Sequence, residues 1–178
     1  MGRNILVVNG HPDPRPERFC AALCTAYEAG ARTRGCATRR LDVAALSLSA
    51  LATGKGTAPL DKLEQAFRLM RAADRLAIFY PLLSDGPPEE LSQLFDYVAR
   101  LRAHLEPAAL GGAKSARIVV TTAMPAFLYR GRAEPVTRHK LCGVVAGEPL
   151  FIGSVDSISS TQRARWLEEM RGLGGKMN

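Results

Sequence analysis

The sequence predicts an α/β fold in which helices cover both faces of a parallel β-sheet. Short apolar runs alternate with amphipathic segments along all 178 residues, and five of these runs have the length of strands. The first, over residues 5–8, is apolar at every position, as a strand buried on both faces requires. Strands that alternate with helices form a parallel sheet with right-handed crossovers. We expect residues 1–178 to form a single domain.

The first part of the chain predicts two strands on either side of a helix. Residues 4–9 form the first strand, and a polar, proline-rich loop follows it. Apolar side chains at helical spacing predict a helix over residues 16–33, with Pro16 in its first turn. Gly35 ends that helix, and residues 37–42 form the second strand.

The middle of the chain predicts two further helices and the third strand. Residues 43–59 form a long loop, which is not a P-loop because neither Ser nor Thr follows its Lys55. Leucine and aromatic residues at helical spacing predict helices around residues 60–70 and 91–101. The continuous apolar run at residues 76–80 predicts a strand between them.

The last part of the chain predicts two strands and one helix. Residues 117–122 form the fourth strand, an irregular segment runs through Pro125, and residues 150–154 form a short fifth strand. Ser159 and Gln162 have the spacing of a capping box, which predicts the start of a final helix.

The composition is that of an ordinary globular protein. Hydrophobic residues make up 47% of the chain and charged residues 23%, which excludes intrinsic disorder. No apolar run approaches the roughly 18–20 residues that span a bilayer. The strand-like run near the N-terminus leaves no room for a signal peptide. We therefore expect a cytoplasmic protein without membrane insertion.

The net charge of +7 and the pI near 9.6 point to an anionic partner. The excess of basic residues lies toward both ends of the chain. Its densest cluster lacks the interleaved aromatic residues of a nucleic-acid platform. The charge therefore favours attraction of a small anion, and we expect no nucleic-acid partner. This cluster consists of Arg130, Arg132, Arg138 and Lys140.

The four cysteines do not predict a metal centre. None forms a CxxC pair, and the three histidines are scattered. Two cysteines four residues apart could face one ligand, but zinc would still need two more. In a cytoplasmic protein, isolated cysteines are typically buried, reduced thiols. We expect this of Cys20, Cys24, Cys36 and Cys142.

Ligands of open α/β sheets bind beyond the carboxyl ends of the strands. After the first strand, polar groups precede a helix N-terminus, where free N–H groups and the helix dipole favour a phosphate. A proline-stiffened turn is the alternative interpretation. After the fourth strand, hydroxyls and small residues suit close approach of a flat ligand, although a structural turn would look similar. The residues of the phosphate cradle would be His11, Arg18, Phe19 and Cys20.

The opening sequence ILVVNGHPDP, over residues 5–14, resembles the start of the flavodoxin-like NAD(P)H:quinone oxidoreductases. This family includes the ancillary subunits of glutathione-gated potassium efflux systems. Later matching segments lie at residues 74–82, 112–117, 124–129 and 143–167, so the resemblance covers nearly the whole chain. It implies a flavodoxin-like three-layer sandwich with a five-stranded parallel sheet of order 2-1-3-4-5. It also implies bound FMN or FAD, NAD(P)H as co-substrate, a small-molecule electron acceptor and a homodimer.

The resemblance assigns roles to the loops that follow three strands. The loop after the first strand holds the flavin phosphate, which implies His11, Arg18, Phe19 and Cys20. The loop after the third lies along the isoalloxazine ring, which implies Pro81, Leu82, Leu83 and Ser84. The loop after the fourth meets the polar edge of the ring, which implies Thr121, Ala123 and Met124. Tyr129 and His139 would stabilise charge during hydride transfer.

Three of these contacts depart from the family pattern. Leu83 and Ser84 replace paired aromatic residues, Ala123 replaces a glycine, and Cys20 replaces an asparagine. Two functions therefore stay open. The first is a flavin-dependent NAD(P)H oxidoreductase acting on a quinone or similar acceptor. The second is a non-catalytic or regulatory relative, with weak or lost flavin binding, that acts as a binding subunit.

Overall fold

The computed structural model describes residues 3–48, 60–83, 86–103, 115–129 and 144–176. Within these residues the strands form one parallel sheet of order β2-β1-β3-β4-β5, and β6 also pairs with β4. This confirms the predicted order. The strands are β1 Asn4–Asn9, β2 Ala37–Asp42, β3 Arg75–Pro81, β4 Ser115–Thr121, β5 Val145–Ala146 and β6 Leu150–Ile152.

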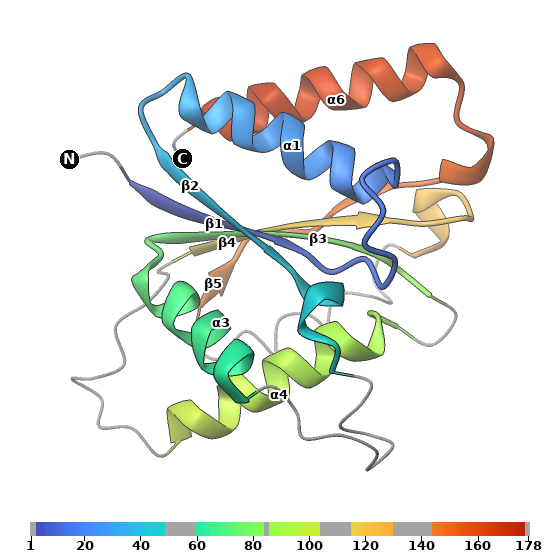
Figure 1. Cartoon of the computed structure of the whole chain (residues 1–178). Helices are drawn as coiled ribbons and strands as arrows, with labels where there is room; N and C mark the ends of the chain where they lie inside the picture. Colours follow the sequence, from blue (N-terminus) through green and yellow to red (C-terminus); the bar gives the residue numbers. More distant parts are fainter. Residues whose placement is uncertain (1–2, 49–59, 84–85, 104–114, 130–143, 177–178) are drawn as a thin grey trace.

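Helices cover both faces of the sheet, as the sequence predicts. Figure 1 shows α1 and α6 on one face and α3 and α4 on the other. Within the described residues, none of the helices has the length and apolar character that crossing a bilayer requires. The α-helices are α1 Phe19–Arg32, α3 Leu60–Ala72, α4 Glu89–Ala103 and α6 Ser160–Gly175. Short 3₁₀ turns are η1 Val43–Leu46, η3 Ala126–Leu128 and η4 Val155–Ser157.

The side chains of β1 alternate between two hydrophobic cores. Ile5 and Val7 pack in the core beneath α1 and α6, whereas Leu6 and Val8 pack in the core against α3 and α4. Both sets are buried, because a strand in the middle of a covered sheet meets helices on each side. The same alternation directs Asn9 toward the α1 side, at the carboxyl end of the strand.

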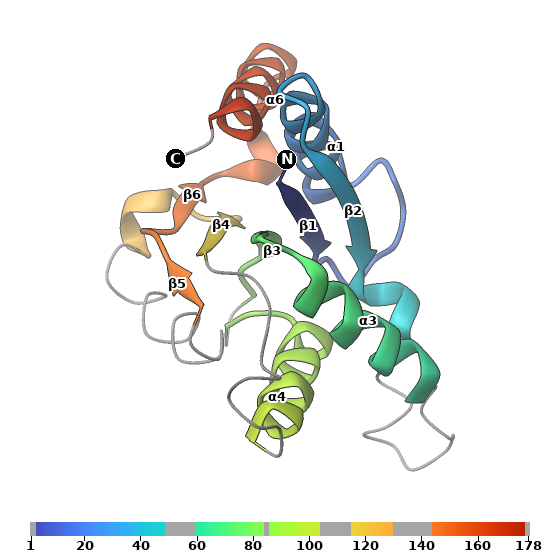
Figure 2. The ribbon, with the colours of Figure 1, turned by 90° about the vertical axis from the view of Figure 1, so that its left-hand side faces the viewer.

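Several predicted boundaries differ from the structure by one to three residues, among them the start of the first helix. Helix α1 begins at Phe19 rather than near Pro16, because Arg18 has an extended backbone and its N–H donates to the Arg15 carbonyl at 3.2 Å. The predicted fifth strand over residues 150–154 is β6, which ends at Ile152, and the short strand β5 precedes it as an addition. Both lie at the edge of the sheet in Figure 2. Pro149 lies between them, and proline has no N–H to continue a ladder.

Two further expectations concern a loop and a helix start. The predicted loop over 43–59 opens with the turn η1, and residues 49–59 lie outside the described part of the chain. The capping box is confirmed, because Gln162 N–H donates to Ser159 Oγ and Ser159 N–H donates to Gln162 Oε1. This exchange satisfies two amide groups that a helix start leaves without partners.

Helices α1 and α6 approach each other closely at two glycines. A Cβ atom on Gly30 would lie 1.9 Å from the carbonyl oxygen of Arg171. A Cβ atom on Gly174 would lie 2.1 Å from the carbonyl oxygen of Tyr27. No side chain fits at either position while the helices keep this separation. The two glycines therefore allow α1 and α6 to pack this closely.

Replacing Gly30 with Ala should therefore lower the free energy of unfolding by roughly 2–3 kcal/mol, at the upper end of overpacking costs. Gly172→Ala is the matched control, because nothing lies within 4 Å of a Cβ at that position in the same helix pair. It should be neutral or stabilising by up to about 1 kcal/mol, since alanine favours helix. Urea unfolding of both variants measures the difference, and equal stabilities would contradict the close approach.

Candidate functional site

The carboxyl ends of β1, β3 and β4 lie together at one end of the sheet, its carboxyl edge. Gly10 N–H, just beyond β1, donates to the Phe79 carbonyl at 2.7 Å. Leu82 N–H, just beyond β3, donates to the Thr121 carbonyl of β4 at 2.8 Å. The Cys20 thiol lies 3.3 Å from the Thr121 hydroxyl, which joins the start of α1 to the end of β4. The structure thus brings the three predicted loops together.

The hydrogen bonds of His11, in the loop after β1, define which ring nitrogen carries the proton. Its backbone N–H donates to Asn9 Oδ1 at 3.3 Å, and its Nδ1 accepts the Asp13 N–H at 2.9 Å. An accepting Nδ1 carries no proton, so the neutral ring keeps its proton on Nε2. Partial burial lowers the pKa of His11, and the nearby Arg18 charge lowers it further. At neutral pH this side chain is therefore an uncharged donor.

Asp13 gathers two arginines in the same loop. Its carboxylate accepts hydrogen bonds from the Arg15 backbone N–H and guanidinium, and also from the Arg18 guanidinium. The hydrogen bonds from Arg15 are the largest cause of a pKa for Asp13 well below its usual range, so this carboxyl stays ionised. Glu17 lies in the same loop, so two carboxylates balance the two arginines, and binding of a further anion would depend on hydrogen-bond donors rather than on net charge.

The start of α1 adds unpaired backbone donors to this loop. Arg18 is the N-cap residue, and its side chain makes no capping hydrogen bond. The first N–H groups of a helix lack partners within the helix and form the positive end of its dipole. The imidazole N–H, the guanidinium groups and this helix start are donors of the kinds that bind phosphate monoesters.

Phe19 and Cys20 place their side chains away from this donor set. Arg163 of α6 lies over the Phe19 ring, with its Cζ 4.8 Å from the ring centroid. Cys20 is 1% exposed, and burial raises the pKa of its thiol to about 11. Both residues would therefore meet a ligand through backbone N–H groups.

The expectation of buried, reduced cysteines is confirmed for the three that the structure describes. These free thiols are Cys20, Cys24 and Cys36, and each is buried. Burial raises the pKa of Cys24 well above its ordinary value. Cys142 lies outside the described residues.

Aliphatic side chains flank the loops after β3 and β4. Leu82 is half-buried, whereas Leu83 and Met124 are 48% and 52% exposed. Leu83 and Gly86 exchange backbone hydrogen bonds, with Gly86 at a φ of 133°. These hydrogen bonds fix the backbone of Leu83 just beyond the end of β3. Ser84 lies outside the described residues.

The loop after β4 is held by hydrogen bonds within the edge. Thr122 Oγ1 donates to the Met124 carbonyl at 2.7 Å, and Thr122 N–H donates to the Ile152 carbonyl at 2.9 Å. Thr121 is buried, so its hydroxyl faces Cys20 rather than solvent. Ala123 is exposed beside these residues, where a flat ligand has room to approach.

Of the two predicted catalytic residues, the structure describes only Tyr129. Tyr129 is half-buried at the end of η3, where its N–H donates to the Ala126 carbonyl at 3.2 Å. His139 lies outside the described residues, as does the basic cluster formed by Arg130, Arg132, Arg138 and Lys140.

Several residues of this edge are not among those that the sequence predicts. Asp13 and Arg15 organise the loop after β1, while Asn9 and Asp42 end neighbouring strands and share a hydrogen bond of 2.8 Å. Asn9 is only 2% exposed. The sequence signal that could have identified Asn9 is a polar residue at the end of an apolar strand. A carboxamide buried there needs specific hydrogen-bond partners.

An anion in this loop should change the titration of His11. In the free protein its imidazole should titrate below 6.5. Adding inorganic phosphate should raise that pKa, because a bound dianion stabilises the imidazolium form. Imidazole NMR signals followed against pH measure the shift, with sodium chloride at equal ionic strength as the control. A titration that phosphate leaves unchanged would count against the cradle.

Solved structures similar to this chain share its fold. An NAD(P)H:quinone oxidoreductase from Methanothermobacter marburgensis superposes with a TM-score of 0.74 at 15% identity, covering 98% of this chain and 96% of that one. An FMN-dependent NADH-azoreductase from Bacillus anthracis, solved with FMN, has a TM-score of 0.66 at 9% identity over 98% of each chain. An NADH:FMN oxidoreductase has a TM-score of 0.65 at 20% identity, covering 97% of this chain and 88% of that one.

Sequence comparison identifies the family. Among curated proteins no sequence matches this chain. A family model described as a flavodoxin-like fold matches residues 3–171, which is nearly the whole chain. The sheet order and the covering helices agree with that match. The chain therefore belongs to the flavodoxin-like fold family.

Proposed function

We propose that this protein is a flavin-dependent NAD(P)H oxidoreductase that reduces a quinone or a similar small-molecule acceptor. The observation that carries the proposal is the donor set of the loop after β1, placed where the ends of β3 and β4 also meet. Structural neighbours named as a quinone oxidoreductase and an FMN-dependent azoreductase support it. When bound, FMN or FAD supplies two-electron transfer between NAD(P)H and the acceptor.

The residues of the site divide by the part of the cofactor that each would contact. His11 Nε2, Arg18 and the N–H groups of Phe19 and Cys20 hold the phosphate. Tyr129 and His139 hold charge or a proton near the reacting atoms. The residues beside the ring are Pro81, Leu82, Leu83, Ser84, Thr121, Ala123 and Met124.

We also propose that the protein is a cytoplasmic homodimer. Phe127 and Leu128 of η3 are 68% and 44% exposed, and Met124 beside them is 52% exposed. Large apolar side chains that gather on a surface are typical of an interface between subunits. A partner subunit over η3 would also shield the neighbouring ring site from water.

The second candidate function is a non-catalytic relative that acts as a binding subunit. The observation in its favour is Leu83, an aliphatic residue at the position where the related oxidoreductases place an aromatic one. An aliphatic side chain offers a flavin ring less flat contact area. This candidate keeps the fold and the loops but binds flavin weakly or not at all.

Flavin titration and turnover distinguish the two candidates. The purified protein should quench the fluorescence of added FMN or FAD and should then oxidise NADH or NADPH in the presence of a naphthoquinone. Binding without turnover for any tested acceptor would favour the non-catalytic relative. A protein that leaves excess FMN and FAD unchanged would rule out the oxidoreductase.

Restoring an aromatic residue should tighten flavin binding. In Leu83→Trp the indole would stack on the ring, and stacking contacts lower Kd by about tenfold or more. Riboflavin should gain as much as FMN, because the new contact is with the ring. Val145→Trp adds the same side chain at a position 73% exposed on β5, and should leave both affinities unchanged. Equal affinities for Leu83→Trp and the parent would mean that the ring lies elsewhere.

A further inference from the structure

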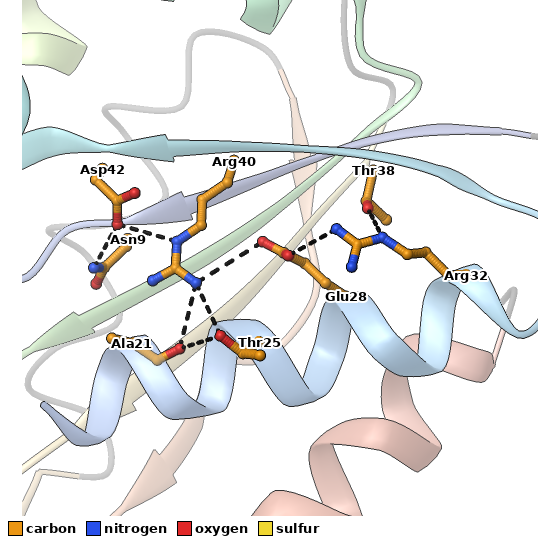
Figure 3. Close-up of polar contacts among 8 residues, drawn as sticks. All are labelled: Asn9, Ala21, Thr25, Glu28, Arg32, Thr38, Arg40 and Asp42. Atoms are coloured by element: carbon orange, nitrogen blue, oxygen red, sulfur yellow. Dashed lines mark hydrogen bonds and ion pairs between the residues drawn. The ribbon is translucent and has the colours of Figure 1, made fainter. Parts of the chain in front are cut away.

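A chain of polar contacts connects β2 to the loop after β1. Asp42, the last residue of β2, accepts hydrogen bonds at one oxygen, Oδ1, from Asn9 Nδ2 at 2.8 Å and from Arg40 Nε at 3.1 Å. Figure 3 shows these three side chains between β1, β2 and α1. Asn9 and Asp42 are direct neighbours in the register of the parallel pair, so the contact follows from the strand alignment.

Arg40 extends the same chain to helix α1. Its Nη1 donates to Thr25 Oγ1 at 3.1 Å and to the Ala21 carbonyl at 3.4 Å, and it lies 4.0 Å from Glu28 Oε1. Glu28 is 6% exposed, and a buried carboxylate requires positive partners. Arg32 is the second positive partner, with its Nη2 at 3.0 Å from Glu28 Oε2 (Figure 3). Arg40 therefore ties the first half of α1 to β2.

The carboxamide of Asn9 has one donor end and one acceptor end. Ionised Asp42 accepts but does not donate, so it orients the Asn9 NH₂ group toward β2. Asn9 Oδ1 must then face the other way, where it accepts the His11 N–H at 3.3 Å. A flipped amide would place NH₂ against N–H at the loop and oxygen against oxygen at β2.

We propose that Asp42 and Arg40 are positioning residues for the phosphate cradle. Asp42 acts through Asn9 on His11, and Arg40 acts on Asp42 and on the N-terminal half of α1. Together they set the loop and the helix start, the two parts that supply phosphate donors. This inference rests on the proposed flavin site. It assigns phosphate recognition to contacts on β2, a strand that supplies no residue to the predicted site.

The network does not extend to the loops after β3 and β4 among the contacts of the described residues. Those loops are joined by other hydrogen bonds, from Leu82 to Thr121 and from Thr122 to Met124. Loss of the network should therefore weaken recognition of the phosphate and spare recognition of the ring. FMN and riboflavin, which differ only in the phosphate, separate the two effects.

The first test compares Asp42→Ala with Asp42→Asn. Removing the acceptor should raise the Kd for FMN by about tenfold, the effect of one or two lost hydrogen bonds. The Kd for riboflavin should stay within about twofold, since riboflavin has no phosphate to lose. In Asp42→Asn, Oδ1 can still accept from both partners, so this variant should retain most of the FMN affinity. Fluorescence quenching measures the Kd of each flavin for the parent and for both variants.

The second test uses two neighbouring arginines on opposite faces of β2. Arg40→Met removes the link to α1 and should raise the Kd for FMN several-fold relative to riboflavin. Arg39 lines a hollow of about 150 Å³ with Leu69 and Ala73 on the α3 side. Arg39→Met loses the same charge from the same strand, so it should leave the ratio of the two affinities unchanged.

The outcomes separate this inference from the proposed function. A parent protein that binds neither flavin overturns the proposed function, and one that binds FMN no better than riboflavin overturns the phosphate cradle. If the parent prefers FMN, equal losses for both flavins in Asp42→Ala or Arg40→Met would overturn the positioning role. Unchanged FMN affinity in both variants would overturn it as well. Should Asp42→Ala fail to fold, the Arg40→Met and Arg39→Met pair decides the result.

Discussion

The parallel pairing of β1 between β2 and β3 is the constraint on which the rest of the structure depends. In a parallel sheet all strands point the same way, so their carboxyl ends share one edge. The register places Asn9 beside Asp42 on one side and Phe79 on the other. Every loop of the candidate site begins from this alignment, and the hydrogen bond from Gly10 to Phe79 continues it past the end of the strand.

The contact between the edge strand β2 and helix α1 is polar. Helix α1 packs over one face of β2, and the Glu28 carboxylate is buried between them. Arg32 and Arg40 surround its carboxylate, and Arg32 Nε also donates to Thr38 Oγ1 on β2 at 2.8 Å. A buried charge without such partners would be strongly destabilising. Arg40 also donates to Asp42, which connects this charge network to Asn9 and the loop after β1.

The strands could be predicted because their signals are local. A continuous apolar run located β1 at its observed bounds. The anion site at His11, inferred from polar residues before a helix start, stays a prediction. The start of α1 was placed too early, since Pro16 suits a first helical turn and nothing in the sequence shows that Arg18 is extended. The pairing of Cys20 with Thr121 could not be predicted either, because it joins residues 101 positions apart.

The sequence by itself determined the alternation of strands and helices, because periodicity and composition are properties of neighbouring residues. The fold family and the strand order came from the resemblance of several segments to a known family, and the loops that would face a ligand stay a prediction. Only the tertiary structure decided how the site is oriented. Asn9, Arg40 and Asp42 look like ordinary polar residues until the register aligns two strands and α1 packs over them. The direction of a carboxamide depends on what lies on each side of it, and folding alone supplies those neighbours.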